Sequence, residues 1–447
     1  FVRCPKSTFF LLFVPDGAKS NLFRRIIVFN IIPQPNQIII SKGKPSFSLS
    51  PDTTVTKTDF TTEFRDFVKK QFDIRIHREI SDDVSIKLVK SSEVAGEEGY
   101  TLISRDGRIY IYGKNECGIF YGLQTLKQLL LQGDGTVPDM YIEDKPLYPY
   151  RGFMLDSSRR FWRTSEIKRL IDLMALHKLN VFHWHLTDDQ GWRIEIKKYP
   201  LLTEKGAWRK FNSHDRECIR LSKTNNNPDM AIPEDKIRIV EGDTLYGGYY
   251  TQEDIKDVIA YAKIRGIDII PEIDMPGHML AAVSNYEGVS CFNETGWGSV
   301  FSSPVCPGKD SALEFCKNVY TELTALFPYK YVHIGGDEVE KTNWKKCPDC
   351  QKRMHDNNLK TEEELQSWFI HDMERFFNGK GKEMIGWDEI IEGGLSKTAT
   401  VMWWRSWVKD AATKTTAQGN PVIFTPNGQF YLDYAEDKNS MASIYNL

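Results

Sequence analysis

The sequence predicts an α/β protein in which a small α+β domain precedes a parallel (β/α)8 barrel of the TIM type. Two observations support this prediction. Short β-type runs and helical stretches are mixed in residues 31–148, whereas strand–loop–helix units repeat through residues 149–447. No strand is followed by a glycine motif for a dinucleotide or a phosphate, so the repeats favour a barrel over a doubly wound sheet.

The composition excludes several classes of protein. Hydrophobic residues make up 41% and charged residues 27% of the 447, which excludes collagen-like and largely disordered chains. The net charge of -3 gives no electrostatic basis for binding nucleic acid or an anionic membrane surface. No apolar run reaches the ~18 residues that a membrane span needs. We therefore expect no nucleic-acid partner and no membrane span, and the oligomeric state stays open.

Residues 1–30 receive no structural assignment. The chain starts at Phe1 rather than at methionine, and Phe1–Lys6 followed by Ser7–Val14 resembles a weak signal peptide without a clear cleavage site. We therefore expect a processed product or a fragment with an extracytoplasmic location, whether periplasmic, secreted or lysosomal.

The eight cysteines are too sparse for a disulfide scaffold in a chain of this length. Cys291 and Cys306 lie in one loop rich in Gly, Ser and Pro, which a disulfide could staple. Cys347 and Cys350 form a CxxC motif with no second half-pair at zinc-finger spacing. A disulfide or two free thiols is the favoured interpretation of this motif, and no metal site is expected.

In the N-terminal domain, alternating patterns predict strands and two apolar stripes predict helices. The strands are expected at Gln37–Ser41, Val84–Val89, Tyr100–Ile103 and Arg108–Tyr112, and the helices at Asp59–Phe72 and Gly118–Leu131. The second helix is expected to bury one stripe, formed by Phe120, Leu123, Leu126 and Leu130. No catalytic constellation is visible in this domain.

In the barrel domain, buried-type runs alternate with helical patterns. Seven strands are expected, at Arg151–Leu155, Val181–Leu186, Ile267–Ile273, Tyr331–Ile334, Glu383–Trp387, Thr400–Trp404 and Pro421–Thr425. The helices between them are expected at Thr164–Lys178, Thr251–Arg265, Lys309–Phe327, Thr361–Asn378 and Ser406–Gln418. A closed barrel has eight strands, so we expect the barrel to be truncated before its eighth strand, with the native reading frame continuing beyond Leu447.

Chemistry in such barrels collects at the carboxyl ends of the strands, and those ends carry an unusual set of residues. Carboxylates, a histidine, arginines and indoles follow the expected strands, as in Asp156, His183–Arg193, Glu272–His278, His333–Glu338 and Trp387–Glu389. This combination is typical of glycoside hydrolysis, in which one acid protonates a leaving oxygen and other polar groups stabilise developing positive charge.

Asp337-Glu338 is the most informative pair. Glycines precede it, and two neighbouring carboxylates tend to share one proton near neutral pH. His278 either caps a loop or receives its orientation from Asp188. Arg151 stands at the start of its strand, so a structural ion pair at the bottom of the barrel is an open alternative to a role in the site.

Taken together, these motifs resemble glycoside hydrolase family 20, the β-N-acetylhexosaminidases. The resemblance rests on His333-Ile-Gly-Gly-Asp337-Glu338 and, in the family's order, on five further segments: Tyr150–Asp156, His183–Gln190, Glu272–His278, Gly386–Glu389 and Tyr431–Asp433. It covers residues 31 to 447. The implied fold is a small α+β domain followed by a catalytic (β/α)8 barrel, as the periodicity predicts.

The resemblance also implies roles for single residues. Glu338 would be the general acid/base, and Asp337 would orient and stabilise the acetamido group of the substrate. Tyr431 would donate a hydrogen bond to that group, Trp387 and Trp404 would form the walls of its pocket, and Trp403 stays an alternative to Trp404. Arg151 and Asp433 would hold sugar hydroxyls, with Asp188 and His278 behind Glu338.

The implied reaction is removal of a terminal β-linked N-acetylhexosamine by substrate-assisted, retaining catalysis through an oxazolinium, without a metal or organic cofactor. The expected partner is an oligosaccharide or glycoconjugate that ends in N-acetylglucosamine or N-acetylgalactosamine. Two other interpretations stay open. One is a metal-dependent hydrolase using Glu272, Asp274, His333 and the acidic pair, and the other is a non-catalytic sugar-binding fragment.

Overall fold

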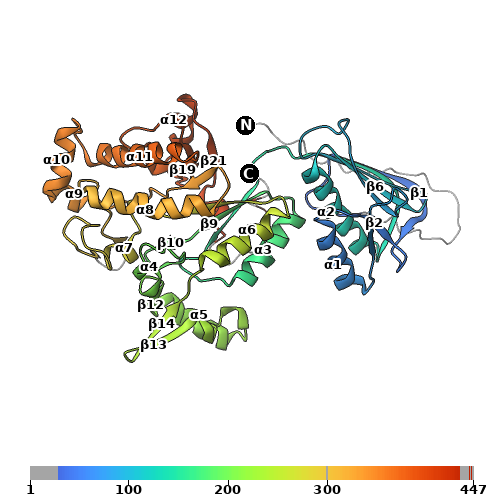
Figure 1. The fold of residues 1–447 in the computed structure, drawn as a ribbon, viewed down its shortest axis with the longest axis horizontal. Coiled ribbons are helices and arrows are strands. Elements are labelled where there is room, and N and C mark those ends of the chain that lie inside the picture. Colours follow the sequence, from blue (N-terminus) through green and yellow to red (C-terminus); the bar gives the residue numbers. More distant parts are fainter. Residues whose placement is uncertain (1–28, 298–300, 433–441, 443, 445–447) are drawn as a thin grey trace.

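The structure is a computed structural model that describes residues 29–297, 301–432, 442 and 444 of the chain. The N-terminal domain lies at one end of the long axis and the barrel domain at the other (Figure 1). Within the described residues, none of the helices has the length and apolar character needed to cross a membrane.

A seven-stranded sheet forms the N-terminal domain, in the order β1-β7-β5-β6-β4-β2-β3. The bounds are β1 Gln37–Ser48, β2 Thr54–Thr56, β3 His77–Glu79, β4 Ile86–Lys90, β5 Tyr100–Arg105, β6 Arg108–Gly113 and β7 Thr136–Asp144. Helices α1 (Thr61–Phe72) and α2 (Glu116–Gln132) complete the domain. All four expected strands and both helices are confirmed. The sequence pattern missed β2 and β3, which are very short, and β7, where Pro138 and Asp139 interrupt the apolar alternation.

Helix α2 is more deeply buried than its sequence predicts. It begins at Asn115, whose side chain accepts hydrogen bonds from the backbone N–H groups of Cys117 and Gly118. All thirteen residues from Gly118 to Leu130 are buried, rather than one stripe. The reason is that α2 also packs against α3 of the barrel domain (Thr164–Leu176), and Gln128 donates a hydrogen bond to the Leu176 carbonyl at 3.2 Å. The helix is therefore the core of the junction between the domains.

Ion pairs reinforce this junction around α2. Arg151 Nη2 lies 2.9 Å from Glu98 Oε1, and Lys178 Nζ lies 2.9 Å from Asp144 Oδ2. Arg151 also donates to the hydroxyl of Tyr121 at 3.0 Å. Each charge thus has an opposite partner contributed by the other domain.

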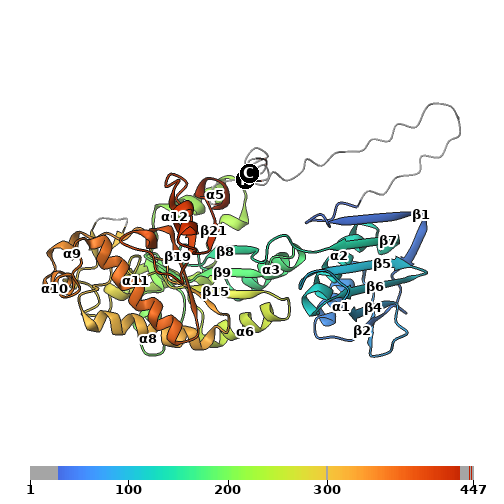
Figure 2. The same ribbon diagram turned by 90° about the horizontal axis from the view of Figure 1, so that it is seen from above.

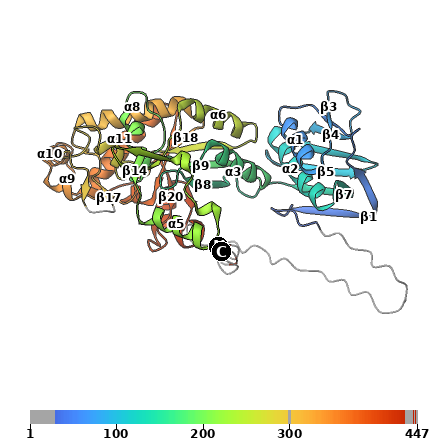
Figure 3. The same cartoon turned by 90° about the horizontal axis from the view of Figure 1, so that it is seen from below.

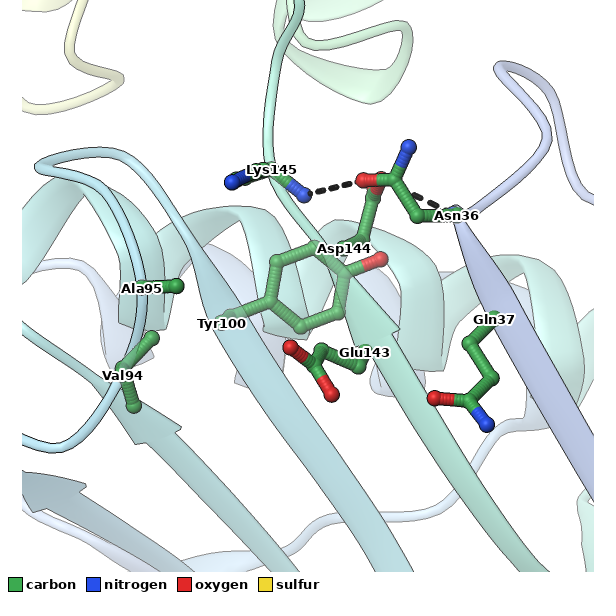
Figure 4. Close-up of a pocket in the computed structure, with 8 residues that line it drawn as sticks. All are labelled: Asn36, Gln37, Val94, Ala95, Tyr100, Glu143, Asp144 and Lys145. Carbon is green, nitrogen blue, oxygen red and sulfur yellow. Dashed lines mark hydrogen bonds between the residues drawn. The ribbon is translucent and has the colours of Figure 1, made fainter.

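A cavity of about 590 Å³ adjoins the junction in the N-terminal domain (Figure 4). The residues that line it are Asn36, Gln37, Val94, Ala95, Tyr100, Glu143, Asp144 and Lys145. Asn36 accepts a hydrogen bond from the backbone N–H of Lys145 at 2.9 Å, and its own N–H donates to Asp144 at 3.3 Å. Asp144, which lines the cavity, also pairs with Lys178 of the barrel domain, so the cavity lies at the junction.

The barrel domain is built on seven parallel strands, in the order β8-β9-β15-β18-β19-β20-β21 (Figures 2 and 3). The bounds are β8 Gly152–Asp156, β9 Val181–His185, β15 Asp268–Glu272, β18 Tyr331–His333, β19 Glu383–Trp387, β20 Thr400–Trp403 and β21 Val422–Phe424. The sheet is curled, and no described residue pairs β21 with β8. The α/β class and the TIM-type architecture behind a small domain are confirmed, with every expected strand in place.

The expected helices are also present, as α3, α6 (Gln252–Lys263), α8 (Asp310–Leu326), α11 (Glu362–Gly379) and α12 (Ala411–Ala417). Only α12 differs appreciably, because residues 406–410 form turns before the helix begins. A small interior core of Val181, Ile270, Ile385, Trp387 and Met402 fills the concave face of the sheet.

The sequence pattern missed the elements inserted after the carboxyl ends of the strands. A three-stranded antiparallel sheet, β12-β14-β13, and helix α5 follow β9, and helices α9 and α10 follow β18. Their bounds are β12 Trp208–Lys210, α5 Ser213–Thr224, β13 Ile237–Val240, β14 Asp243–Gly247, α9 Thr342–Lys346 and α10 Pro348–Asp356. The remaining short elements are β10 Thr187–Asp188, β11 Gly191–Trp192, α4 Leu201–Glu204, α7 Leu280–Val283, β16 Gly296–Trp297, β17 Phe301–Ser302 and α13 Asn427–Phe430, with 3-10 turns at Pro228–Met230, Glu234–Lys236 and Asp388–Ile391.

Tryptophan is confined to the barrel domain. All eleven tryptophans follow residue 160, and Trp184, Trp192 and Trp344 are fully buried there. The core of the N-terminal domain is built instead from aliphatic, phenylalanine and tyrosine side chains such as Phe64 and Leu126.

Candidate active site

The carboxyl ends of β8, β9, β15, β18, β19 and β20 lie at one end of the parallel sheet, and polar side chains gather there. The innermost is Glu272 at the end of β15, which is fully buried. Its Oε2 lies 2.9 Å from His183 Nε2 and 2.8 Å from His185 Nδ1, and its Oε1 accepts a hydrogen bond from Trp387 Nε1 at 2.8 Å. His333 Nδ1 lies 3.2 Å from the same Oε1. This cluster forms the floor of the site.

The charge of Glu272 is retained in spite of its burial. Burial alone would raise the pKa of this carboxyl, but His185, His333 and His183 hold it well below its usual range. His333 shows the opposite balance, since burial lowers its pKa to about 4 despite the neighbouring Glu272. The surroundings therefore favour an anionic Glu272 in the floor, with a neutral imidazole at His333.

A chain of alternating carboxylates and imidazoles leads from this floor to the acidic pair. His185 Nε2 lies 3.0 Å from Asp188 Oδ2, and Asp188 Oδ1 lies 3.2 Å from His278 Nδ1. On its other side, His278 Nε2 lies 3.4 Å from Glu338 Oε2 and 3.7 Å from Asp337 Oδ2. The structure thus brings together Asp188, His278, Asp337 and Glu338, all four of which the sequence singled out.

The surroundings of His278 favour its positively charged form. Burial lowers the pKa of its imidazole, but the attraction of Asp188, with the hydrogen bonds that the imidazole donates to Asp188, Asp189 and Glu338, raises it well above its usual range. Asp188 responds in the opposite direction. Its burial is outweighed by Arg159 and His278, which hold its pKa well below the ordinary value.

The turn after β18 needs its two glycines. Gly335 and Gly336 have φ of 75° and 97°, in the left-handed region that favours glycine. A Cβ on Gly335 would lie 1.9 Å from Asp274 Oδ1, whereas the Gly336 N–H donates to that oxygen at 3.1 Å. Glu338 follows with φ of 49°, a left-handed backbone conformation that is uncommon for residues other than glycine.

The two members of the acidic pair occupy different environments. The side chain of Asp337 is 17% exposed and that of Glu338 is 39% exposed. Burial raises the pKa of Asp337 above its ordinary value, although His278 acts in the opposite direction, and the fully buried Asp274 beside it has a pKa raised well above its usual range by burial and by the charge of Asp337. Burial therefore favours a proton on the inner pair of Asp274 and Asp337, whereas Glu338 is the more exposed carboxylate.

A second acidic pair ends β19. Asp388 Oδ2 accepts a hydrogen bond from Arg405 Nε at 2.7 Å, and Glu389 Oε2 accepts one from Trp404 Nε1 at 2.9 Å. Burial and the nearby charge of Asp337 raise the pKa of Glu389 to about 8, against the lowering effect of Arg405. This pair holds the loop that follows β20.

Aromatic rings lie beside these carboxylates. Trp404 packs against the interior core and is stacked on Tyr431, with ring centroids 5.9 Å apart and planes at 21°. Trp403 instead donates its N–H to the Arg405 and Val408 carbonyls at 3.0 and 3.1 Å. Of the two indoles that the sequence left open, Trp404 is thus the one beside Tyr431. Trp387 is buried beneath them, with its N–H bonded to Glu272.

The structure corrects the expectation for Arg151. This arginine stands at the amino end of β8, where it pairs with Glu98 in the domain junction, so it lies at the wrong end of the sheet to hold a sugar. Arg159, which the sequence analysis missed, follows the same strand and lies 2.8 Å from Asp188 Oδ2 and 3.1 Å from Asp156 Oδ2. Its place directly after a strand end, beside Asp156, was the signal that could have identified it. Asp433 lies outside the described residues.

The residues that a metal-dependent hydrolase would use as ligands belong to two separate groups in the structure. His183, Glu272 and His333 are close enough to share an ion, and Asp274, His278 and Asp337 form a separate group. In the first group Glu272 is already bonded to Trp387 and the imidazoles, and all three residues are buried away from any substrate. The arrangement therefore favours acid–base chemistry at the exposed Glu338 over a metal-bound nucleophile.

The chain is similar to known proteins over nearly all of its length. The family model for the glycosyl hydrolase family 20 catalytic domain matches residues 148–446, and the model for domain 2 of the same family matches residues 28–145. A beta-hexosaminidase of Porphyromonas gingivalis is 41% identical over 430 residues, which are 91% of this chain and 51% of that protein.

Solved structures show the same likeness. The crystal structure of a beta-N-acetylhexosaminidase from Bacteroides fragilis superposes with a TM-score of 0.76 at 32% identity, covering 91% of this chain and 77% of that one. An exo beta-N-acetylglucosaminidase from Vibrio harveyi in complex with N-acetylglucosamine gives a TM-score of 0.77 at 33% identity, covering 91% and 62%. The chain spans about half the length of the Porphyromonas relative.

Proposed function

The chain belongs to glycosyl hydrolase family 20, and on that premise we propose that it is a retaining exo-hydrolase that removes terminal β-linked N-acetylglucosamine or N-acetylgalactosamine. The single observation that carries the proposal is the contact of His278 with both Asp337 and Glu338 at the carboxyl end of β18. This contact places the more exposed carboxylate of Glu338 and the more buried carboxylate of Asp337 beside the imidazole of His278. The partner would be an oligosaccharide or glycoconjugate that ends in such a sugar.

In the proposed reaction Glu338 is the general acid and then the general base. As the more exposed member of the pair, it can reach the oxygen that links the terminal sugar to the rest of the substrate. His278 would act on the substrate through Glu338 and not by direct contact, so it is a positioning residue. Asp188 holds its imidazole in turn. Arg159 completes this support through its ion pair with Asp188.

Asp337 would act on the acetamido group. It lies deeper than Glu338, and its charge acts on the Tyr431 hydroxyl, whose pKa is raised by burial and then by Asp337. Tyr431, stacked on Trp404, would donate to the acetamido oxygen while Asp337 accepts from the acetamido N–H. Trp404 would form a wall of the pocket, and the buried Trp387 its base.

The proposed chemistry has two steps. First, the acetamido oxygen bonds to the anomeric carbon while the bond to the leaving oxygen breaks and that oxygen takes the proton of Glu338, which gives an oxazolinium. Asp337 balances the positive charge on the oxazolinium N–H. Second, water attacks the anomeric carbon and Glu338 takes a proton from that water. The bond between the anomeric carbon and the acetamido oxygen breaks, so the β configuration is retained.

Paired aryl glycosides test the proposal. An aryl β-N-acetylglucosaminide should be cleaved, and the matching β-glucoside, which lacks the acetamido group, should be essentially untouched. Equal rates on the two substrates would contradict substrate assistance, as would a covalent glycosyl adduct trapped on Asp337. Binding of N-acetylglucosamine without turnover would favour a non-catalytic sugar-binding chain instead.

We also propose an extracytoplasmic location, periplasmic, secreted or lysosomal, because glycans with such termini are most abundant outside the cytoplasm. Fractionation of the source cells with an antibody against the barrel domain tests this. Recovery of the protein only with cytoplasmic markers would contradict it.

A further inference from the structure

Four cysteine thiols from distant parts of the chain meet in the barrel domain, at the end of the molecule away from the N-terminal domain. They are Cys291, Cys306, Cys347 and Cys350, all buried, and their sulfur atoms lie within 4.8 Å of one another. Cys347 and Cys350 lie at the start of α10, which Figure 1 places at that end. Seven of the eight cysteines are described, and all seven are free thiols, so neither disulfide considered from the sequence is present in the described residues.

The sulfur–sulfur distances are compatible with four ligands of one ion. Cys306 Sγ lies 3.4 Å from Cys350 Sγ and 3.8 Å from Cys347 Sγ, and Cys291 Sγ lies 3.7 Å from Cys350 Sγ. Zinc–sulfur bonds of about 2.3 Å in tetrahedral geometry place neighbouring sulfurs about 3.8 Å apart. In two separate disulfide pairs each sulfur would have one close partner, whereas Cys306 and Cys350 each have two here.

The backbone around the thiols is shaped for this contact. Residues 290 and 305 form an antiparallel bridge, which brings together the two segments that carry Cys291 and Cys306, although fifteen positions separate these cysteines in the sequence. Gly308 lies against the CxxC turn so closely that a Cβ there would be 2.3 Å from Cys350 N. Pro348 is the first residue of α10, and the helix N-terminus favours negatively charged thiolates at Cys347 and Cys350.

A positive charge stands next to the cluster. Lys309 Nζ donates to the carbonyl oxygens of Ser290 and Cys291 at 2.9 and 2.8 Å. Four thiolates around a divalent cation carry a net charge of 2−, which a neighbouring ammonium group and the α10 N-terminus would offset.

We propose that Cys291, Cys306, Cys347 and Cys350 bind one structural zinc ion through four thiolates. Binding at neutral pH releases the thiol protons to solvent, with no change of oxidation state. Because all four coordination positions are filled by sulfur and the site is buried, the ion is structural rather than catalytic.

The ion would anchor the loop that supports His278. Between Cys291 and Cys306, Ser302 accepts a hydrogen bond from the Met279 N–H at 3.0 Å and donates its own N–H to Asp189 at 3.2 Å. The Val305 N–H donates to Pro276 O at 2.8 Å. These contacts hold the segment on both sides of His278, so the four thiolates brace the site without touching it. The inference stands whether or not the proposed hydrolase activity is correct.

Metal content of the purified full chain tests the proposal. Elemental analysis of protein produced without added chelator should find one zinc per chain. Cys350→Ser and Cys306→Ser should lose most of it, while Cys316→Ser, a matched control at a fully buried thiol outside the cluster, should keep it. If the cluster variants fail to fold, the wild-type protein still answers the question. Stepwise titration of its thiols with a mercurial should release zinc in proportion to the cluster cysteines that have reacted, and refolding with cobalt should give the absorption of a tetrahedral cobalt thiolate.

Three results would overturn the proposal. Mass measurement after alkylation without reductant would do so if it showed two disulfides among the four cysteines and no bound metal. Equal zinc content in Cys350→Ser and the wild type would place the ion elsewhere. Iron in place of zinc in protein produced with both metals supplied would make the assignment of the ion wrong.

Discussion

The two ends of the barrel sheet both carry networks of charged side chains, but the networks differ in how they are balanced. At the amino end, each carboxylate meets one cation, Glu98 with Arg151 and Asp144 with Lys178. At the carboxyl end, Asp188, Asp189, Asp274, Asp337, Glu338 and Glu389 outnumber the cationic Arg159, His278 and Arg405. A paired network holds two domains together, whereas a surplus of carboxylates leaves protons and charge available for a substrate.

The largest effect should come from the exposed carboxylate at the carboxyl end. We expect Glu338→Gln to lower kcat on a natural disaccharide by ~10²–10⁴-fold, because Gln cannot protonate the leaving oxygen. Activated aryl glycosides, which leave without protonation, should be affected much less. Glu340→Gln, two residues further along the same loop and bonded to Thr342, is the matched control and should leave kcat close to that of the wild type. An unaltered rate for Glu338→Gln on the disaccharide would end its assignment as general acid.

The inner carboxylate should show a different pattern. Asp337→Asn is expected to lower kcat by roughly 10²–10³-fold on natural and activated substrates alike, because the charge on the acetamido nitrogen develops whatever group leaves. For each variant, the loss of kcat on the natural substrate is divided by the loss of kcat on the activated substrate. This ratio should be near one for Asp337→Asn and large for Glu338→Gln. If Asp337→Asn spared activated substrates as Glu338→Gln should, the two residues would have the same role and the assignment would be wrong.

A pair of arginine variants tests the comparison directly. Arg159→Gln should lower kcat/KM by about tenfold or more, since it removes a charge-assisted contact from Asp188 and so from the support of His278. Arg151→Gln should leave kcat/KM nearly unchanged but lower the free energy of unfolding by about 1–3 kcal/mol through loss of its bonds to Glu98. Measuring kinetics and thermal unfolding on both variants gives the answer. A large loss of kcat/KM in Arg151→Gln with normal stability would restore the role that the resemblance first suggested for it.

The smallest effect concerns pH. The folded-state pKa of Glu389 is about 8 and its ordinary value is 4.5, so the folded protein binds this proton more tightly than the unfolded chain does. Its contribution to stability should therefore fall as the pH rises from about 4.5 to about 8. Glu389→Gln, which can still accept from Trp404, should flatten this part of the curve by a few degrees of Tm. The measurement is Tm as a function of pH, from about 4 to about 9, a range that brackets both pKa values. Parallel Tm curves for the variant and the wild type over this range would contradict the assignment.

Much of this arrangement could be predicted from the sequence because it depends on local pattern. The seven barrel strands are short apolar runs bounded by polar residues, and Asp337-Glu338 directly follows one of them. Local pattern did not reveal the function of Arg151, because the partner that decides it, Glu98, lies 53 positions earlier in the chain.

The same reason explains the cysteines. The CxxC motif looked like half of a site, since its second half-pair, Cys291 and Cys306, lies 41 to 59 positions away along the chain. The bridge between residues 290 and 305 joins the segments of Cys291 and Cys306, and the packing of Gly308 against the CxxC turn brings them to Cys347 and Cys350. Sequence spacing reports zinc sites when both half-pairs are near in the chain, and this cluster is assembled by the tertiary fold. Helix α2 shows a third case, because its second buried face is created by a helix of the other domain.

The confinement of tryptophan to the barrel domain gives the molecule a built-in optical reporter. With excitation selective for indole, emission comes from the barrel domain alone, because all eleven tryptophans follow residue 160. Far-ultraviolet circular dichroism, in contrast, registers both domains. If the two signals change together during denaturation, the domains unfold as one unit across α2. An earlier change in dichroism would instead show the N-terminal sheet melting while the indoles remain in a native barrel.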